Sequence, residues 1–127
     1  LFRSNITFSG GDPMFQLEAF TQLASIIKAK SNRNIWCYTG YTFEQLLRNP
    51  KALNLLKNID VLVDGRFVEE LKSKDILFRG SSNQRLIDVQ KSLKAGEIVI
   101  YEPMNLLSPL LMKYKRVDNS SLLTPHS

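Results

Sequence analysis

The chain has 127 residues, a length that suits one domain with a real core but is short for a complete catalytic barrel. No stretch approaches the roughly 20 apolar residues that cross a bilayer, and the start lacks the layout of a signal peptide. The net charge is +5, but its basic residues are scattered, so we expect neither a membrane nor nucleic acid as a partner. A single cysteine excludes an internal disulfide, and we expect a cytoplasmic protein.

The hydrophobic pattern alternates strands with helices, which predicts a parallel α/β arrangement. We expect strands over residues 6–8, 35–38 and 59–63 and helices over residues 14–30, 43–48 and 50–57. Apolar residues recur at helical spacing in the first helix. Thr42 and Gln45 form a capping-box pair at the start of the second. The third strand has a nearly continuous apolar run, as expected when helices cover both faces of a sheet.

The later part of the chain has weaker patterns. Shorter apolar runs over residues 76–79, 86–89 and 98–101 predict strands or strand-like segments, whose order in the sheet is open. Beyond Glu102 the composition changes to a leucine-rich stretch with helical spacing and then to a polar tail. We therefore expect an α/β domain over residues 1–101 and a C-terminal extension over residues 102–127.

Three expected strands run into glycine or polar residues where they end. Ser9-Gly10-Gly11-Asp12 follows the first strand, Thr39-Gly40 the second and Asp64-Gly65-Arg66 the third. Ligands of parallel α/β sheets gather beyond the carboxyl ends of the strands, and right-handed crossovers bring these three exits to one rim. We therefore expect Gly11, Thr39 and Asp64 to face a common cleft. Each group is also typical of an ordinary turn or a loop brace.

Two further features allow a functional and a structural interpretation. The segment Gly80-Ser81-Ser82-Asn83-Gln84-Arg85 is dense in hydrogen-bond donors, and it is either an anion-cradling loop or a hydrogen-bonded turn. Cys37 lies inside an expected strand, where we interpret it as a small buried hydrophobe. The chain contains no metal-ligand constellation, catalytic triad or Walker motif, so we assign no catalytic and no metal-ligating residue.

Four blocks resemble one enzyme family in their order and spacing: residues 9–13, 34–42, 59–67 and 78–85. The family is the activating enzyme of anaerobic (class III) ribonucleotide reductase, which belongs to the radical S-adenosylmethionine (SAM) superfamily. The resemblance runs from about Ile6 to Leu93 and implies a partial parallel (β/α) barrel of the radical SAM type. That family carries a Cys-x3-Cys-x2-Cys motif upstream of the Gly-Gly-Asp turn to hold an iron–sulfur cluster, whereas this chain has Cys37 alone.

The resemblance also implies roles at the rim. The glycine-rich turn would meet the methionine amino group of SAM, with Asp12 standing where the superfamily usually has Glu. Arg66, next to Asp64 in an acid-x-base arrangement, would meet the SAM carboxylate. Asn83 and Arg85 would lie near SAM or near the entering radical loop of the partner. The cofactor-binding residues expected on this basis are Gly10, Gly11, Asp12, Thr39, Asp64, Arg66, Asn83 and Arg85.

The function implied by the resemblance is the activation of anaerobic ribonucleotide reductase. An intact enzyme would pass an electron from a flavodoxin-like donor through a 4Fe–4S cluster to SAM, and a 5′-deoxyadenosyl radical would then abstract hydrogen from a glycine of the large reductase subunit. The chain starts without an initiator Met, just before a strand, so we expect the C-terminal portion of such an enzyme, lacking the N-terminal strand and helix. Without cluster-binding thiolates it should be inactive. The alternative is a non-catalytic binding module that docks the reductase or a small ligand.

Overall fold

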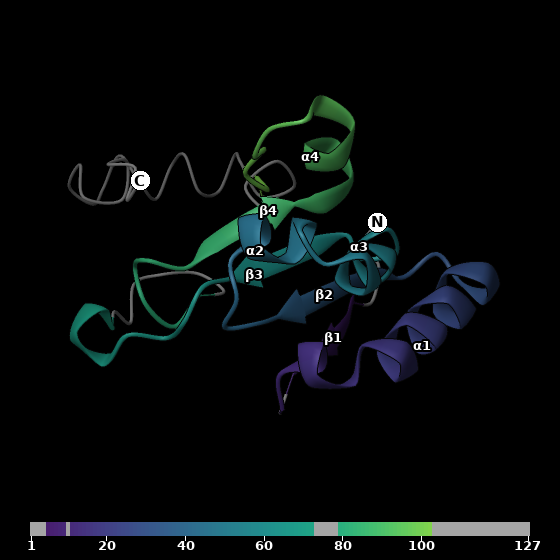
Figure 1. Ribbon diagram of the computed structural model, residues 1–127, viewed down its shortest axis with the longest axis horizontal. Coiled ribbons are helices and arrows are strands. Elements are labelled where there is room, and N and C mark those ends of the chain that lie inside the picture. Colours follow the sequence, from purple (N-terminus) through teal and green to yellow (C-terminus); the bar gives the residue numbers. More distant parts are fainter. Residues whose placement is uncertain (1–4, 10, 73–78, 103–127) are drawn as a thin grey trace, which may run out of the picture.

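The computed structural model describes residues 5–9, 11–72 and 79–102, to which the structural statements below refer. One four-stranded sheet, in the order β1-β2-β3-β4, forms the centre of the fold (Figure 1). Its strands are β1 (Asn5–Phe8), β2 (Asn34–Tyr38), β3 (Val61–Asp64) and β4 (Arg85–Asp88). The first three run parallel, and β4 is antiparallel to β3. The predicted α/β class is thus confirmed as an open, mostly parallel sheet, consistent with part of a radical SAM barrel.

The helices lie in the connections between the strands. A 3₁₀ turn, η1 (Pro13–Gln16), leads into α1 (Leu17–Lys30), so the predicted first helix is confirmed but opens with a tighter turn. Helices α2 (Phe43–Leu47) and α3 (Pro50–Leu56) join β2 to β3. The predicted capping box is present, because Thr42 and Gln45 each accept a hydrogen bond from the other's backbone N–H. A 3₁₀ turn, η2 (Glu69–Leu71), lies between β3 and β4.

The segment after β4 contains a helix that the sequence pattern did not predict, α4 (Val89–Ala95). Asp88 ends the strand and caps this helix by accepting a hydrogen bond from Lys91 N at 3.1 Å. Residues 98–101 then run beside β4, as the predicted strand-like segment, through an antiparallel bridge between Ile87 and Ile100. Most of the expected strand over residues 76–79, and the extension beyond Glu102, lie outside the described residues, so the division into two regions stays a prediction.

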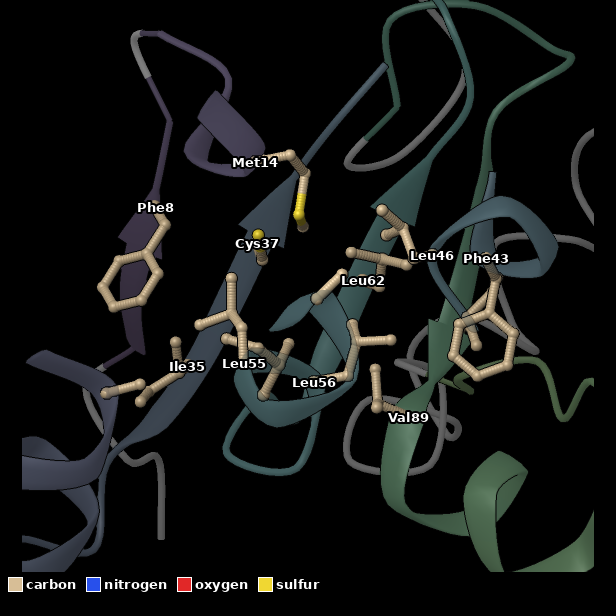
Figure 2. Close-up of a cluster of buried hydrophobic side chains, with 14 residues drawn as sticks. Phe8, Met14, Ile35, Cys37, Phe43, Leu46, Leu55, Leu56, Leu62 and Val89 are labelled. Atoms are coloured by element: carbon tan, nitrogen blue, oxygen red, sulfur yellow. The ribbon is translucent and has the colours of Figure 1, made fainter. Parts of the chain in front are cut away.

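The core fills the side of the sheet that faces the helices. Figure 2 shows Cys37 and Leu62 on neighbouring strands, with Leu55 and Leu56 of α3 among the side chains of the same cluster. Cys37 is fully buried, as predicted, and burial is the main reason that its pKa rises to about 12. A smaller cluster around Trp36 occupies the other face. Among the described helices, none has both the length and the apolar composition needed to cross a membrane.

Candidate functional site

The exits of β1, β2 and β3 lie at one edge of the sheet, as the parallel register requires. A shallow hollow of about 250 Å³ opens there. The hollow is lined by Ser9, Gly11, Asp12, Tyr38, Thr39, Gly40, Gly65, Phe67 and Gln84. The predicted common rim is therefore confirmed for Gly11 and Thr39. Asp64 does not line the hollow, and its neighbour Gly65 takes that place.

Asp12 joins the turn after β1 to the turn after β2. Its Oδ1 accepts hydrogen bonds from Met14 N at 3.0 Å and from Thr39 Oγ1 at 2.9 Å. Its Oδ2 accepts one from Gly40 N at 2.9 Å. These donors are neutral, and no described lysine or arginine forms an ion pair with Asp12. A half-buried carboxylate with neutral partners brings negative charge to the wall of the hollow, which suits a cationic ligand group.

Asp64 stabilises the fold and does not line the hollow. Its carboxyl group is buried and accepts hydrogen bonds from Phe43 N at 2.7 Å and from Arg85 Nε at 3.0 Å. Arg85 also reaches Glu44, with 2.7 Å between Nη2 and Oε1. The hydrogen bonds that Arg85 donates to the two carboxylates, first to Asp64, raise the pKa of Arg85, and the bond from Arg85 is the main cause that lowers the pKa of Glu44. These contacts brace the ends of β3, β4 and α2 against one another.

The other predicted residues lie beside this brace. The side chain of Arg66 is exposed, and its carbonyl accepts a hydrogen bond from Asn83 Nδ2 at 2.8 Å. Asn83 Oδ1 in turn accepts one from Ser81 Oγ at 2.6 Å. Asp64 pairs with Arg85, and none of the described ion pairs joins Asp64 to Arg66. Gly10 lies outside the described residues.

Three residues that the sequence analysis did not single out line the hollow: Tyr38, Phe67 and Gln84. Tyr38 is the last residue of β2, and in the sequence it belongs to the apolar run of the strand and not to the polar exit that follows it. Gln84 lies in the donor-rich block, directly before β4. The signal that could have found it is its position just before an apolar strand, since strand ends supply residues to such rims.

The residues of this chain do not fit an iron–sulfur cluster. Such clusters are held by thiolates, and Cys37 is the single cysteine. It is buried in the core with a pKa of about 12, so its thiol is protonated near neutral pH. Within the described residues, no three His, Cys, Asp or Glu side chains gather where they could hold a metal ion.

Comparison with known proteins shows the family of the chain. Residues 3–87 match the family model described as "4Fe-4S single cluster domain", and the chain belongs to that family. It is homologous to proteins named anaerobic ribonucleoside-triphosphate reductase-activating protein. The relative from Enterobacteria phage T4 is 42% identical over 84 residues, which is 64% of this chain and 51% of the relative.

Bacterial relatives with the same name give similar values. The Vibrio cholerae protein is 42% identical and the Escherichia coli K12 protein 39% identical, each over 85 residues, which is 65% of this chain and 54% of the relative. The chain thus spans about half the length of the curated relatives it matches. No solved structure matches the chain.

Proposed function

We propose that this chain is the SAM-holding portion of an enzyme that activates anaerobic ribonucleotide reductase. The printed names of its homologues support the reaction class, and the hollow at the carboxyl ends of β1–β3 supports the ligand site. The proposed partners are the large subunit of the reductase and a flavodoxin-like electron donor. A cytoplasmic location is part of the same proposal.

The observation that carries the ligand assignment is the Asp12 carboxylate. Three neutral donors hold it at the wall of the hollow, and no described basic side chain pairs with it. A ligand ammonium would form a charge-assisted hydrogen bond there, which is roughly twice as strong as a neutral one. SAM carries such an ammonium on its methionine part.

Gly11 supports the same assignment by the space around it. A Cβ built at Gly11 would have no atom of the described residues within 4 Å, its chain neighbours aside, and its φ is not in the left-handed region. The fold itself therefore does not require glycine at this position. The open space next to Asp12 is available to a ligand that approaches the backbone closely.

SAM, when bound, supplies the 5′-deoxyadenosyl group from which enzymes of this superfamily generate their radical. The contribution of this chain would be placement: Asp12 orients the amino end, while Tyr38 and Phe67 give the hollow aromatic walls. The 127 residues contain Cys37 as their single thiol. The cluster ligands must therefore come from elsewhere, and we expect the chain by itself to be inactive.

Calorimetric titration of the 127-residue chain tests this proposal. SAM and S-adenosylhomocysteine carry the ammonium, whereas 5′-methylthioadenosine lacks the amino-acid part and serves as the internal control. We expect Asp12→Asn to weaken the two ammonium-bearing ligands about tenfold and to leave methylthioadenosine binding unchanged. No binding of SAM to the wild-type chain would overturn the assignment. An equal loss for all three ligands would show that the substitution disturbs the rim and would remove the role of the charge.

A second candidate function is that of a non-catalytic docking module. Two observations favour it: the burial of Cys37, which leaves the chain without an available cluster ligand, and two exposed aromatic rings. Phe15 is 75% exposed, and its ring lies 6.3 Å from that of Tyr41, centroid to centroid, beside the rim. Exposed aromatic side chains are frequent in protein interfaces. A module of this kind would bind the large reductase subunit in a pull-down and give no heat with SAM, and this pair of results would favour it over the first proposal.

A further inference from the structure

Gln84 joins two loops at the hollow through its side-chain amide. Its Nε2 donates a hydrogen bond to Gly65 O at 2.8 Å. Its Oε1 accepts hydrogen bonds from Gly80 N at 2.8 Å and from Ser81 N at 3.2 Å. The amide can be oriented in one way only, because a carbonyl faces its nitrogen and two N–H groups face its oxygen. Gln84 is 8% exposed and Gly65 and Ser81 are buried, so loss of these bonds would leave the buried Gly65 carbonyl and Ser81 N–H unpaired.

The turn after β3 supplies two walls of the hollow. Gly65 lines it directly and has a φ of 98°, a conformation that glycine adopts readily. Phe67 is the other wall, and its ring lies against Gly80, where a Cβ would be only 2.8 Å from the Phe67 Cδ1 atom. The bond from Gly80 N to Gln84 therefore fixes the residue on which the Phe67 ring packs. One amide thus sets the relative position of the turn after β3 and of an aromatic wall.

We propose that Gln84 is a positioning residue for ligand binding in this hollow, acting through Gly65 and Phe67. This inference rests on the proposed function, since it assigns Gln84 to the same ligand site. A purely structural role would lower stability and affect ligand affinity only through the fraction of folded protein. A positioning role lowers affinity in chains that are fully folded, because a ligand must then be bound by walls that are not prearranged.

The chain offers a matched control in Gln90. Its Nε2 donates to backbone carbonyls of Leu56, Lys57 and Ile59, at 3.1, 3.2 and 2.7 Å. These carbonyls lie next to the start of β3, at the opposite end of the sheet from the hollow. Gln84→Glu and Gln90→Glu make the same chemical change, and each places a carboxylate oxygen against a backbone carbonyl. They differ in their distance from the hollow and in burial, since Gln84 is buried and Gln90 is exposed.

The experiment compares wild-type chain, Gln84→Glu and Gln90→Glu, each shown to be folded by its melting curve. Calorimetry with SAM measures affinity, and hydrogen exchange measures opening of the segments around Gly65 and residues 80–81. We expect Gln84→Glu to weaken SAM binding about tenfold and to accelerate exchange in both segments. Gln90→Glu should bind SAM as the wild type does, whatever its melting temperature. Gln84→Met, which keeps the side-chain length without a charge, replaces Gln84→Glu if that variant does not fold.

The outcomes separate the inference from the function on which it rests. If the wild-type chain binds SAM and Gln84→Glu binds it equally well, the positioning role is wrong and the proposed function stands. If the wild-type chain does not bind SAM, the proposed function fails. Hydrogen exchange then still tests whether Gln84 holds the segments around Gly65 and residues 80–81 in place. Unchanged hydrogen exchange in Gln84→Glu would overturn that claim as well.

Discussion

Replacing Arg85 by Met should cost this fold more stability than any other change of one charged side chain at the rim. Arg85 pairs with Asp64, whose side chain is 1% exposed. Without Arg85, the Asp64 carboxylate keeps the hydrogen bond from Phe43 N but loses its described cationic partner. Breaking a buried pair in this way costs about 3–5 kcal/mol. The Arg85 side chain is 33% exposed, so water replaces part of what is lost, and we expect about 3 kcal/mol.

For a chain of this size, that loss lowers the melting temperature by roughly 10 °C. The matched comparison is Glu44→Gln, which removes the other carboxylate on Arg85. The Glu44 side chain is 50% exposed, so this change should cost at most about 1 kcal/mol. Chemical denaturation with tryptophan fluorescence measures both variants, and a double variant with Asp64→Asn should recover at least about 1 kcal/mol relative to the sum of the single changes. Equal costs for Arg85→Met and Glu44→Gln, or strict additivity with Asp64→Asn, would refute the reasoning.

Three further outcomes are expected. Gly11→Val should keep the wild-type melting temperature within a few degrees, because a Cβ there meets no atom of the described part of the chain beyond its own neighbours, and should abolish the calorimetric SAM signal; unchanged SAM binding would remove Gly11 from the site. Cys37 should react with a thiol reagent only as fast as the fold opens, and stability should fall as pH rises from 9 towards 12, since the unfolded thiol ionises first; rapid labelling of the native chain would contradict its burial. Anaerobic reconstitution of the 127-residue chain should give no stoichiometric 4Fe–4S cluster, which iron and sulfide analysis checks.

Alternation of strands and helices was sufficient to predict the parallel part of the sheet and the rim. Strands that end in glycine or a polar residue before a helix place those residues at the same edge of a parallel sheet, and the exits of β1 and β2 lie there. The same pattern did not predict the direction of β4. Residues 65–84, which connect β3 to β4, contain only the short turn η2 among their described elements, and no helical spacing indicated a crossover.

The direction of β4 also determines which basic residue pairs with Asp64. In the sequence analysis, Asp64 stands beside Arg66 in an acid-x-base arrangement, with a loop brace as the alternative to a ligand contact. In the antiparallel register, Asp64 at the end of β3 stands directly opposite Arg85 at the start of β4. Opposite residues on neighbouring strands approach each other closely enough for their side chains to interact. Pairing over 21 positions in sequence follows from topology, which a local pattern does not contain.

Asp12 ties ligand recognition to the cohesion of the fold. The same carboxylate that we assign to a ligand cation caps η1 and holds the turns after β1 and β2 together. A substitution at this position would therefore change ligand affinity and stability together, so the two properties cannot evolve independently there. A chain that had lost ligand binding during evolution would still retain aspartate here, because Asp12 stabilises the fold. Retention of this residue in a relative is thus weak evidence for activity, whereas retention of an open Gly11 beside it, which the fold does not require, is stronger.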